Sequence, residues 1–336
     1  MKARHRTALV LAGGLLLAGV VLLVLGLGVG STGFDSVLRS GRDAVDSQIL
    51  WDIRLPRTLG AWLAGALLGL AGAVAQGLFR NPLADPFLLG SASGASLGVT
   101  LALALFGVSP FATEWLVRLG LTGAAFAGAV AGVLLTLTLA KGVQHTLRLL
   151  LAGVIVGVVL GAAKDLVTLS SPDTLQAMQA FMLGSTGFVG WTACAVMAVT
   201  LLAAMLVAVA LAPVLDSLTL GEHTARSLGL PLAPMRAALV AVLALATGAA
   251  VAQTGLIAFV GLAAPHLVRS IVRSTHGRLI FLSGLMGGLL LMAADLLARW
   301  LVAPQELPVG VLTALLGGSY LLWLMHRRGA RGGSFA

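Results

Sequence analysis

The residues best suited to chemistry in this sequence are a carboxylate and a guanidinium four positions apart, Asp295 and Arg299, in an otherwise apolar segment. On a helix this spacing places both side chains on one face, where they form an ion pair. A carboxylate that lacks a partner inside an apolar bundle can instead carry a proton or a sodium ion. The spacing favours a structural pair, and ion coupling through Asp295 remains the alternative.

The sequence motifs of ATP-binding and hydrolytic enzymes are absent from these 336 residues. No lysine stands in the G-K-[ST] context of a Walker A motif, and neither H-E-x-x-H nor G-x-S-x-G occurs. His266 has no second ligand at helical spacing, so we predict a structural histidine. The single cysteine, Cys194, lies in an apolar run and is expected to pack as a small hydrophobic residue. We therefore expect a chain that is not an enzyme and that holds no metal or cofactor itself.

Composition places these residues in a membrane. Hydrophobic residues make up 59% of the chain and charged residues 10%, against about 25% charged residues in ordinary globular proteins. A spanning helix needs roughly 20 apolar residues. Nearly charge-free stretches recur at 7–34, 58–79, 87–113, 119–140, 149–163, 174–215, 237–268, 279–294 and 307–325. Because 237–268 has room for a full helix and a shorter one, we predict an all-α integral membrane protein of about ten transmembrane helices, forming a single domain over 1–336.

The distribution of positive charge predicts the orientation of the chain. If the first helix runs outward from Lys2, Arg4 and Arg6, most of the 21 Lys and Arg residues fall in cytoplasmic segments, and both termini are cytoplasmic. The net charge of +9 is not gathered on one face, which argues against nucleic-acid binding.

Seven Lys and Arg residues are exceptions to this distribution, and we expect three of them to meet at the outer mouth of the bundle: Arg54, Arg57 and Arg299. They either cap helices and contact lipid phosphates or form a docking surface for an acidic partner.

Two interruptions of the apolar pattern are candidates for a translocation path. Prolines 82 and 86 forbid a continuous helix through Asn81–Pro86, and residues 90–96 are all small. Small residues leave room for a pathway, although close helix packing is the more common reason for such a run. The quartet 73–76 recurs at 250–253, and each copy precedes a Pro-containing break, as in transporters built from repeats. The candidate path residues are Gln76, Asn81, Pro82, Ser91, Ser93 and Gly94.

Two loops have distinct patterns. Residues 31–56 mix Asp and Arg and are expected to form an ordinary solvated outer loop. The cytoplasmic loop 213–233 predicts a short amphipathic helix, with Ser217 or Thr219 as its cap, Glu222 in its first turn, and Gly229 with Pro231 as a stop signal. That helix is either a surface element without a partner or a docking element that binds a cytoplasmic protein.

Several strings together resemble the FecCD-type permeases, the membrane subunits of bacterial ABC importers for iron-siderophores, haem and cobalamin. They are R-L-P-R at 54–57, R-N-P-L-A-D-P at 80–86, F-V-G-L-x-x-P-H at 259–266, Asp295 with Arg299, and L-P-V-G at 307–310. The similarity covers about residues 50–328. The family usually has Gly-x-Pro-Phe in its last helix, where this chain has G-G-S-Y at 317–320, so we expect a straighter last helix here.

The resemblance implies a type II ABC importer permease with ten helices in the bacterial inner membrane, acting as a homodimer. Its partners would be two ATPase subunits, which hold ATP and Mg, and a periplasmic binding protein. It implies docking of the binding protein on Arg54, Arg57 and Arg299. It also implies contact of the ATPase with Gly221, Glu222, Ala225, Leu228 and Gly229. The expected cargo is haem or a ferric siderophore, and cobalamin is the alternative cargo. The alternative mechanism is an ion-coupled secondary transporter that uses Asp295. A scaffold without transport activity is a third possibility, but it leaves the interrupted helices unexplained.

Overall fold

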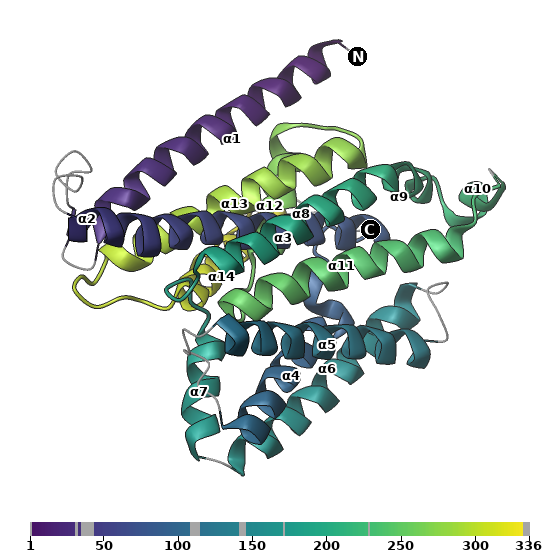
Figure 1. The fold of residues 1–336 in the computed structure, drawn as a ribbon. Helices are drawn as coiled ribbons and strands as arrows, with labels where there is room; N and C mark the ends of the chain where they lie inside the picture. Colours follow the sequence, from purple (N-terminus) through teal and green to yellow (C-terminus); the bar gives the residue numbers. More distant parts are fainter. Residues whose placement is uncertain are drawn as a thin grey trace.

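The computed structural model describes residues 2–30, 33–34, 44–107, 115–140, 146–170, 172–227 and 229–331. The helices are α1 (Lys2–Gly28), α2 (Ala44–Ile49), η1 (Leu50–Arg54), α3 (Leu55–Leu78), η2 (Pro86–Leu89), α4 (Ser91–Phe106), α5 (Trp115–Leu139), α6 (Thr146–Leu169), α7 (Pro172–Leu183), α8 (Trp191–Ala210), α9 (Ala212–Thr219), α10 (Glu222–Ser227), α11 (Leu232–Thr254), α12 (Val260–Ile271), α13 (His276–Trp300) and α14 (Val309–Arg331). Two short strands, β1 (Val29–Gly30) and β2 (Gly33–Phe34), pair antiparallel. The described part of the chain is therefore almost entirely helical, as its composition predicts (Figure 1).

Seven helices of the described residues are long and apolar enough to cross a membrane, and Ser91–Phe106 and Val309–Trp323 are shorter apolar helices. The multi-pass membrane architecture is confirmed, whereas the number ten stays a prediction. Two long apolar stretches are divided as the sequence suggests. The stretch 174–215 holds α7, α8 and the start of α9, and the stretch 237–268 is shared by α11 and α12. The predicted outer loop is wrong in part. Residues 44–54 are helical and continue into α3, while residues 31–32 and 35–43 lie outside the described residues.

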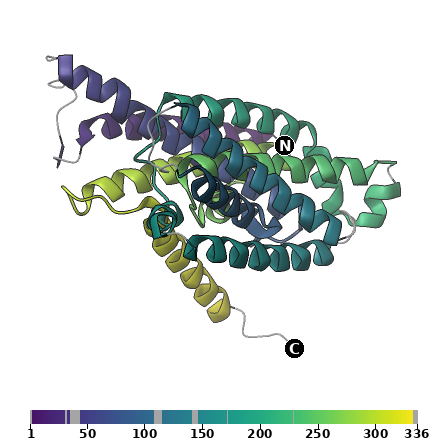
Figure 2. The ribbon, with the colours of Figure 1, turned by 60° about the horizontal axis from the view of Figure 1, so that its bottom comes forward.

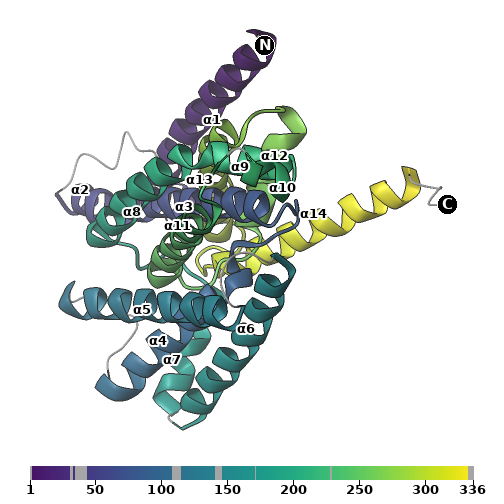
Figure 3. The same cartoon turned by 90° about the vertical axis from the view of Figure 1, so that its right-hand side faces the viewer.

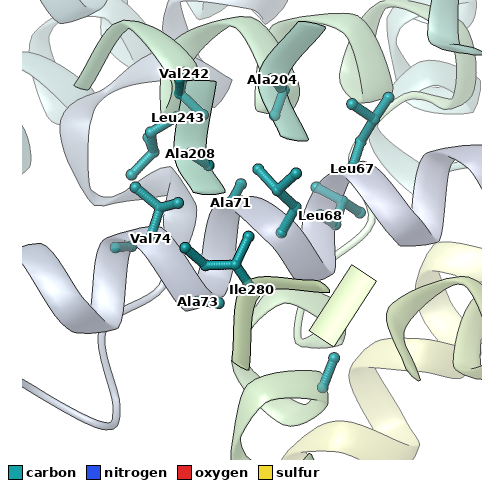
Figure 4. Close-up of a cluster of buried hydrophobic side chains, with 14 of the residues drawn as sticks. Leu67, Leu68, Ala71, Ala73, Val74, Ala204, Ala208, Val242, Leu243 and Ile280 are labelled. Atoms are coloured by element: carbon teal, nitrogen blue, oxygen red, sulfur yellow. The ribbon is translucent and has the colours of Figure 1, made fainter. Parts of the chain in front are cut away.

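α3 forms the centre of the bundle and is buried along nearly its whole length. Its partner α13 approaches closely because both helices present glycines at the contact. A methyl group at Gly65 or Gly69 would overlap the backbone of α13. Small residues at a helix crossing allow backbones to approach in this way. Around this pair, α8 and α11 complete an apolar core that is made mainly of Leu, Val, Ile and Ala side chains (Figure 4).

A second packing unit forms beside this core, where α4 crosses α5 and packs on α6 (Figure 3). A methyl group at Gly94 or Gly98 in α4 would overlap the backbone of α5, and one at Gly128 in α5 would overlap the backbone of α4. The small-residue run that opens α4 thus lies at a close helix crossing.

The last helix extends away from the rest of the bundle. Figures 2 and 3 show α14 leaving the bundle near its first residues and projecting toward the C-terminus. It is continuous from Val309 to Arg331, which agrees with a last helix that lacks the family's proline. Gly317 contacts Phe259, the N-cap of α12, whose φ of 69° is unusual for a residue with a side chain.

Candidate functional site: a charged cluster and a helical segment at opposite ends of α13

A charged cluster lies near the C-terminal end of α13, and its centre is the fully buried carboxylate of Asp295. Arg299 Nη2 lies 2.5 Å from Asp295 Oδ2, one helical turn away. Arg57 of α3 donates to Asp295 Oδ1 from Nη2 at 3.2 Å and from Nε at 3.3 Å. The hydroxyl of Thr186 donates to the same oxygen. Asp295 is therefore paired with two guanidiniums, which confirms the expected structural pair with Arg299.

The remaining donors of Arg299 are satisfied inside the protein. Its Nη1 donates to the carbonyl oxygen of Gly26 at 3.3 Å, and its Nη2 donates to Thr58 Oγ1 at 3.2 Å. The side chain is 2% exposed. The expectation that Arg299 presents a docking surface therefore needs correction, because in this structure the guanidinium joins α13 to α1 and α3 and does not reach the surface.

Arg57 and Arg54 are more exposed than Arg299. Arg57 is 11% exposed, and its Nη1 lies 2.9 Å from Glu306, which is 35% exposed in the loop after α13. Arg54 is half-buried and donates from Nη1 to the carbonyl oxygen of Leu27 at 3.0 Å. The structure thus brings Arg57 and Arg299 together on Asp295, whereas Arg54 contacts the end of α1. Docking on Arg57 and Arg54 stays a prediction.

At the other end of α13 lies the segment formed by α9 and α10, residues 212–227, which we call the α9–α10 segment (Figure 1). Glu222 stands in the first turn of α10, as predicted, and its Oε1 lies 3.2 Å from Arg236 Nη1 of α11. Ala225 is fully buried against the bundle. Gly221 and Gly229, at φ of 102° and 74°, adopt the left-handed conformation that glycine allows, one on each side of α10.

The cap of α10 differs from the sequence prediction, and one predicted contact residue of this segment is not described by the structure. Ser217 and Thr219 do not cap α10, because their hydroxyls donate to the carbonyl oxygens of Val214 and Asp216, three residues earlier. Leu228, one of the five residues expected to contact an ATPase, lies outside the described residues.

The candidate path residues are divided between surface and interior. Asn81 and Pro82 are exposed in the break after α3, and Asn81 Oδ1 accepts a hydrogen bond from the backbone N–H of Leu83 at 2.9 Å. Gln76 is buried. Its Nε2 donates to the carbonyl oxygen of Leu262 at 3.3 Å, and Arg269 of α12 donates to its Oε1. Gln76 therefore fixes α12 against the end of α3.

The three candidates in α4 are held mainly by packing. Ser91 and Gly94 are buried, and Gly94 lies against Gly128 of α5, whereas Ser93 is partly exposed. This geometry favours the close-packing alternative for Gly94. A role of Gln76, Asn81, Pro82, Ser91 or Ser93 in a path stays a prediction.

Sequence reasoning missed several polar contacts because their partners are distant in the chain. Thr186 and Glu306 complete the charged cluster, and Asp216 of α9 contacts His276 at the start of α13. The available signal was weak: Asp216 is an isolated carboxylate at the end of a long apolar run. Within the described ranges, no group of three or more His, Cys, Asp and Glu side chains could hold a metal ion. His266 makes an edge-on ring contact with Tyr320, with ring centroids 5.9 Å apart.

Comparisons with known proteins give this geometry its context. Residues 15–327 match the model of the FecCD transport family. The chain is 38% identical over 319 residues to the hemin transport system permease protein HmuU of Yersinia pestis, covering 94% of this chain and 95% of that protein. It is 40% identical over 281 residues to the vitamin B12 import system permease protein BtuC of Escherichia coli O6:H1, covering 83% of this chain and 84% of that protein. A solved structure described as a metal-chelate type ABC transporter in an inward-facing conformation matches with a TM-score of 0.83 at 30% identity, over 94% of this chain and 98% of that one.

Proposed function

Because the chain belongs to the FecCD transport family, we propose that it is the membrane permease subunit of an ATP-driven importer for an iron chelate. The observation that carries this proposal is the continuous similarity to the hemin permease, which covers 94% of the chain. We further propose a homodimer that works with two ATP-hydrolysing subunits and one soluble binding protein. ATP and Mg would bind to those subunits, since this chain has no Walker A motif.

In this proposal the two ends of α13 face different compartments. The α9–α10 segment lies in the cytoplasm and contacts the ATPase, while Arg57 and Arg54 face the binding protein on the outside. The basic residues Lys2, Arg4 and Arg6 at the start of α1 support this orientation. Figure 1 places the N-terminus toward the same side of the bundle as α10 and away from α2.

The proposed mechanism is alternating access. A chelate is too large and polar to cross hydrocarbon unaided, so the dimer would enclose it loosely and release it after each reversal. ATP binding changes the spacing of the two ATPase subunits, and the α9–α10 segments carry that change into the bundle. Each ligand biases the states only by its differential affinity, so the binding protein must prefer one of them.

Haem or a ferric siderophore is the proposed cargo, and cobalamin is the second candidate. Similarity to the vitamin B12 permease, at 40% identity, supports the second candidate almost as well. We assign selection of the cargo mainly to the binding protein.

An ion-coupled transporter is the rival mechanism, and it requires a carboxylate that can gain and lose its ion. Asp295 was the candidate for that role. Its carboxylate contacts Arg299, Arg57 and Thr186, so it is already paired inside the protein and is not the unpartnered carboxylate that ion coupling requires. The geometry therefore supports the ATP-driven reading over this rival.

The proposal is tested by capturing partners and comparing cargoes. The tagged chain is expressed with the ATPase and the binding protein encoded beside its gene, purified, and assayed for both partners. The binding protein is titrated with haem, a ferric siderophore and cobalamin, and uptake of each is then followed in proteoliposomes. We expect the ATPase to copurify and the tightest ligand of the binding protein to be transported. A chain that purifies without an ATPase would contradict the proposal.

A further inference from the structure

A polar contact joins α9 to the first residue of α13. Asp216 Oδ1 accepts a hydrogen bond from the backbone N–H of His276 at 3.0 Å, and it lies 2.7 Å from His276 Nδ1. Because an ionised carboxylate can only accept, Nδ1 carries the hydrogen in this pair. Asp216 Oδ1 thus contacts both the backbone N–H and the imidazole of His276.

Asp216 also supplies a cap that α13 does not have in its own sequence. The N-cap residue, Thr275, makes no side-chain capping bond. The first N–H groups of a helix lack partners within it, and negative charge is favoured there by the helix dipole. The cap therefore comes from a different helix, so a displacement of α9 acts directly on the end of α13.

A third helix meets at the same point. A Cβ atom at Gly77, near the end of α3, would lie 2.9 Å from His276 Cδ2 and 3.2 Å from Leu215 Cδ1. The imidazole ring is thus packed against the backbone of α3, on a residue that has no side chain to yield. A side chain at position 77 would have to displace the His276 ring and would crowd Leu215, so the glycine leaves room for both where α3, α9 and α13 meet.

The α9–α10 segment has a second anchor, the contact of Glu222 with Arg236, whose side chain is 3% exposed in α11. The segment is therefore attached to two different helices by two polar contacts. These two contacts oppose sliding of the segment over α11 and α13.

The far end of α13 carries the charged cluster. Nineteen residues separate His276 from Asp295, which is roughly 30 Å along a helix. Between these ends α13 packs on α3 through Gly65 and Gly69, where the two backbones are in contact. α13 and α3 can therefore move together as one body between the α9–α10 segment and Arg57.

We propose that the Asp216–His276 contact is the joint through which displacement of the α9–α10 segment moves α13 and α3. Asp216 and His276 are positioning residues in this proposal, because they act through the helices that they join. The inference rests on the proposed function, in which an ATPase displaces this segment. It adds the residues that convert that displacement into movement of the bundle.

The test measures how many cargo molecules enter proteoliposomes for each ATP hydrolysed, in complexes with the partner ATPase. His276→Ala removes the imidazole contact but keeps the backbone N–H that Asp216 caps. Asp216→Asn keeps an acceptor oxygen for both donors. The matched control is His326→Ala, at an exposed position in α14.

We expect His276→Ala to copurify with the ATPase and to lower transport per ATP about five- to tenfold. His326→Ala should stay close to the wild type, and Asp216→Asn, which keeps an acceptor but loses the negative charge at the start of α13, should fall between His326→Ala and His276→Ala. A wild-type ratio in His276→Ala would overturn the inference. Loss of the ATPase from that variant would also overturn it, because the contact would then serve assembly. Failure of the wild type to capture an ATPase would instead contradict the proposed function.

Discussion

Arg57 and Asp295 are 238 residues apart in the chain, yet the guanidinium of Arg57 makes two hydrogen bonds, of 3.2 and 3.3 Å, to one oxygen of the Asp295 carboxylate. The same carboxylate pairs with Arg299 on its other oxygen. This arrangement joins α3 to α13 at the end of the bundle opposite the α9–α10 segment. It leaves Arg57 with one guanidinium nitrogen directed to Glu306 and the surface.

Asp295→Asn is expected to destabilise the protein, because it leaves the buried guanidinium of Arg299 without a carboxylate partner and leaves Arg57 with Glu306 alone. Loss of one partner from a buried ion pair costs about 3–5 kcal/mol. Thermal unfolding of the purified protein in detergent measures the effect. Asp165→Asn is the matched control, since Asp165 is an exposed carboxylate paired with the neighbouring Lys164. An equal unfolding temperature in Asp295→Asn and the control would show that the cluster does not stabilise the fold.

Glu306→Gln should strengthen docking of an acidic binding protein, whereas Arg57→Gln should weaken it. Glu306 occupies the outer nitrogen of Arg57, and a partner carboxylate must replace it. An exposed pair contributes only about 0–1 kcal/mol, so this exchange is easy. Dissociation constants at low and high salt measure the effect, and the difference between the two variants should shrink as salt screens the charges. Weaker docking in Glu306→Gln would contradict the exchange.

Gly72→Ala should disrupt the contact between α3 and α12, because its methyl group would overlap the carbonyl oxygen of Gly261. Overpacking of this kind costs about 1–3 kcal/mol or more, since neither backbone can yield. The control is Gly161→Ala in α6, where a Cβ atom meets nothing within 4 Å. Yield and unfolding temperature in detergent should fall for Gly72→Ala alone. Equal values for both variants would show that the two helices are not packed as described.

Asp85→Asn should raise stability at neutral pH. Burial raises the pKa of Asp85 above its usual value, while the hydrogen bond from the Phe87 N–H lowers it by a smaller amount. The carboxylate is therefore harder to ionise in the folded protein, and stability is lost as the pH rises from about 4 through the folded pKa. Asparagine cannot ionise and keeps an acceptor for Phe87. Unfolding temperatures of the two proteins should diverge as the pH rises over this window, and a constant difference would refute this account of Asp85.

The membrane architecture and the main interruptions between helices could be predicted from the sequence, because apolar stretches and prolines determine the structure of their own segment without distant partners. The division of 237–268 into α11 and α12 follows from its length alone. The number of spanning helices does not follow from the apolar stretches alone, because α4, α7 and α12 are shorter than a full span of roughly 20 residues. The acidic and basic residues of 44–54 predict a solvated loop, but these residues are helical and continue into α3.

The charged cluster could be predicted only in part. The spacing of Asp295 and Arg299 predicts their pairing, since both lie on one helix. The burial of Arg299 depends on Thr58 and on the Gly26 carbonyl oxygen, which belong to other helices. No local sequence pattern indicates such contacts, so the sequence predicts Arg299 at the surface. The Asp216–His276 contact cannot be predicted from the sequence for the same reason, because its two residues lie on different helices.

The central claim is that ATP hydrolysis by a partner, acting on this chain, drives uptake. It is tested most directly in proteoliposomes that contain the complete complex, with the loaded binding protein on one side and ATP on the other. Uptake is compared with ATP, with a non-hydrolysable analogue, and with a proton or sodium gradient alone. The account predicts uptake only with hydrolysable ATP. Uptake driven by an ion gradient without ATP would contradict it.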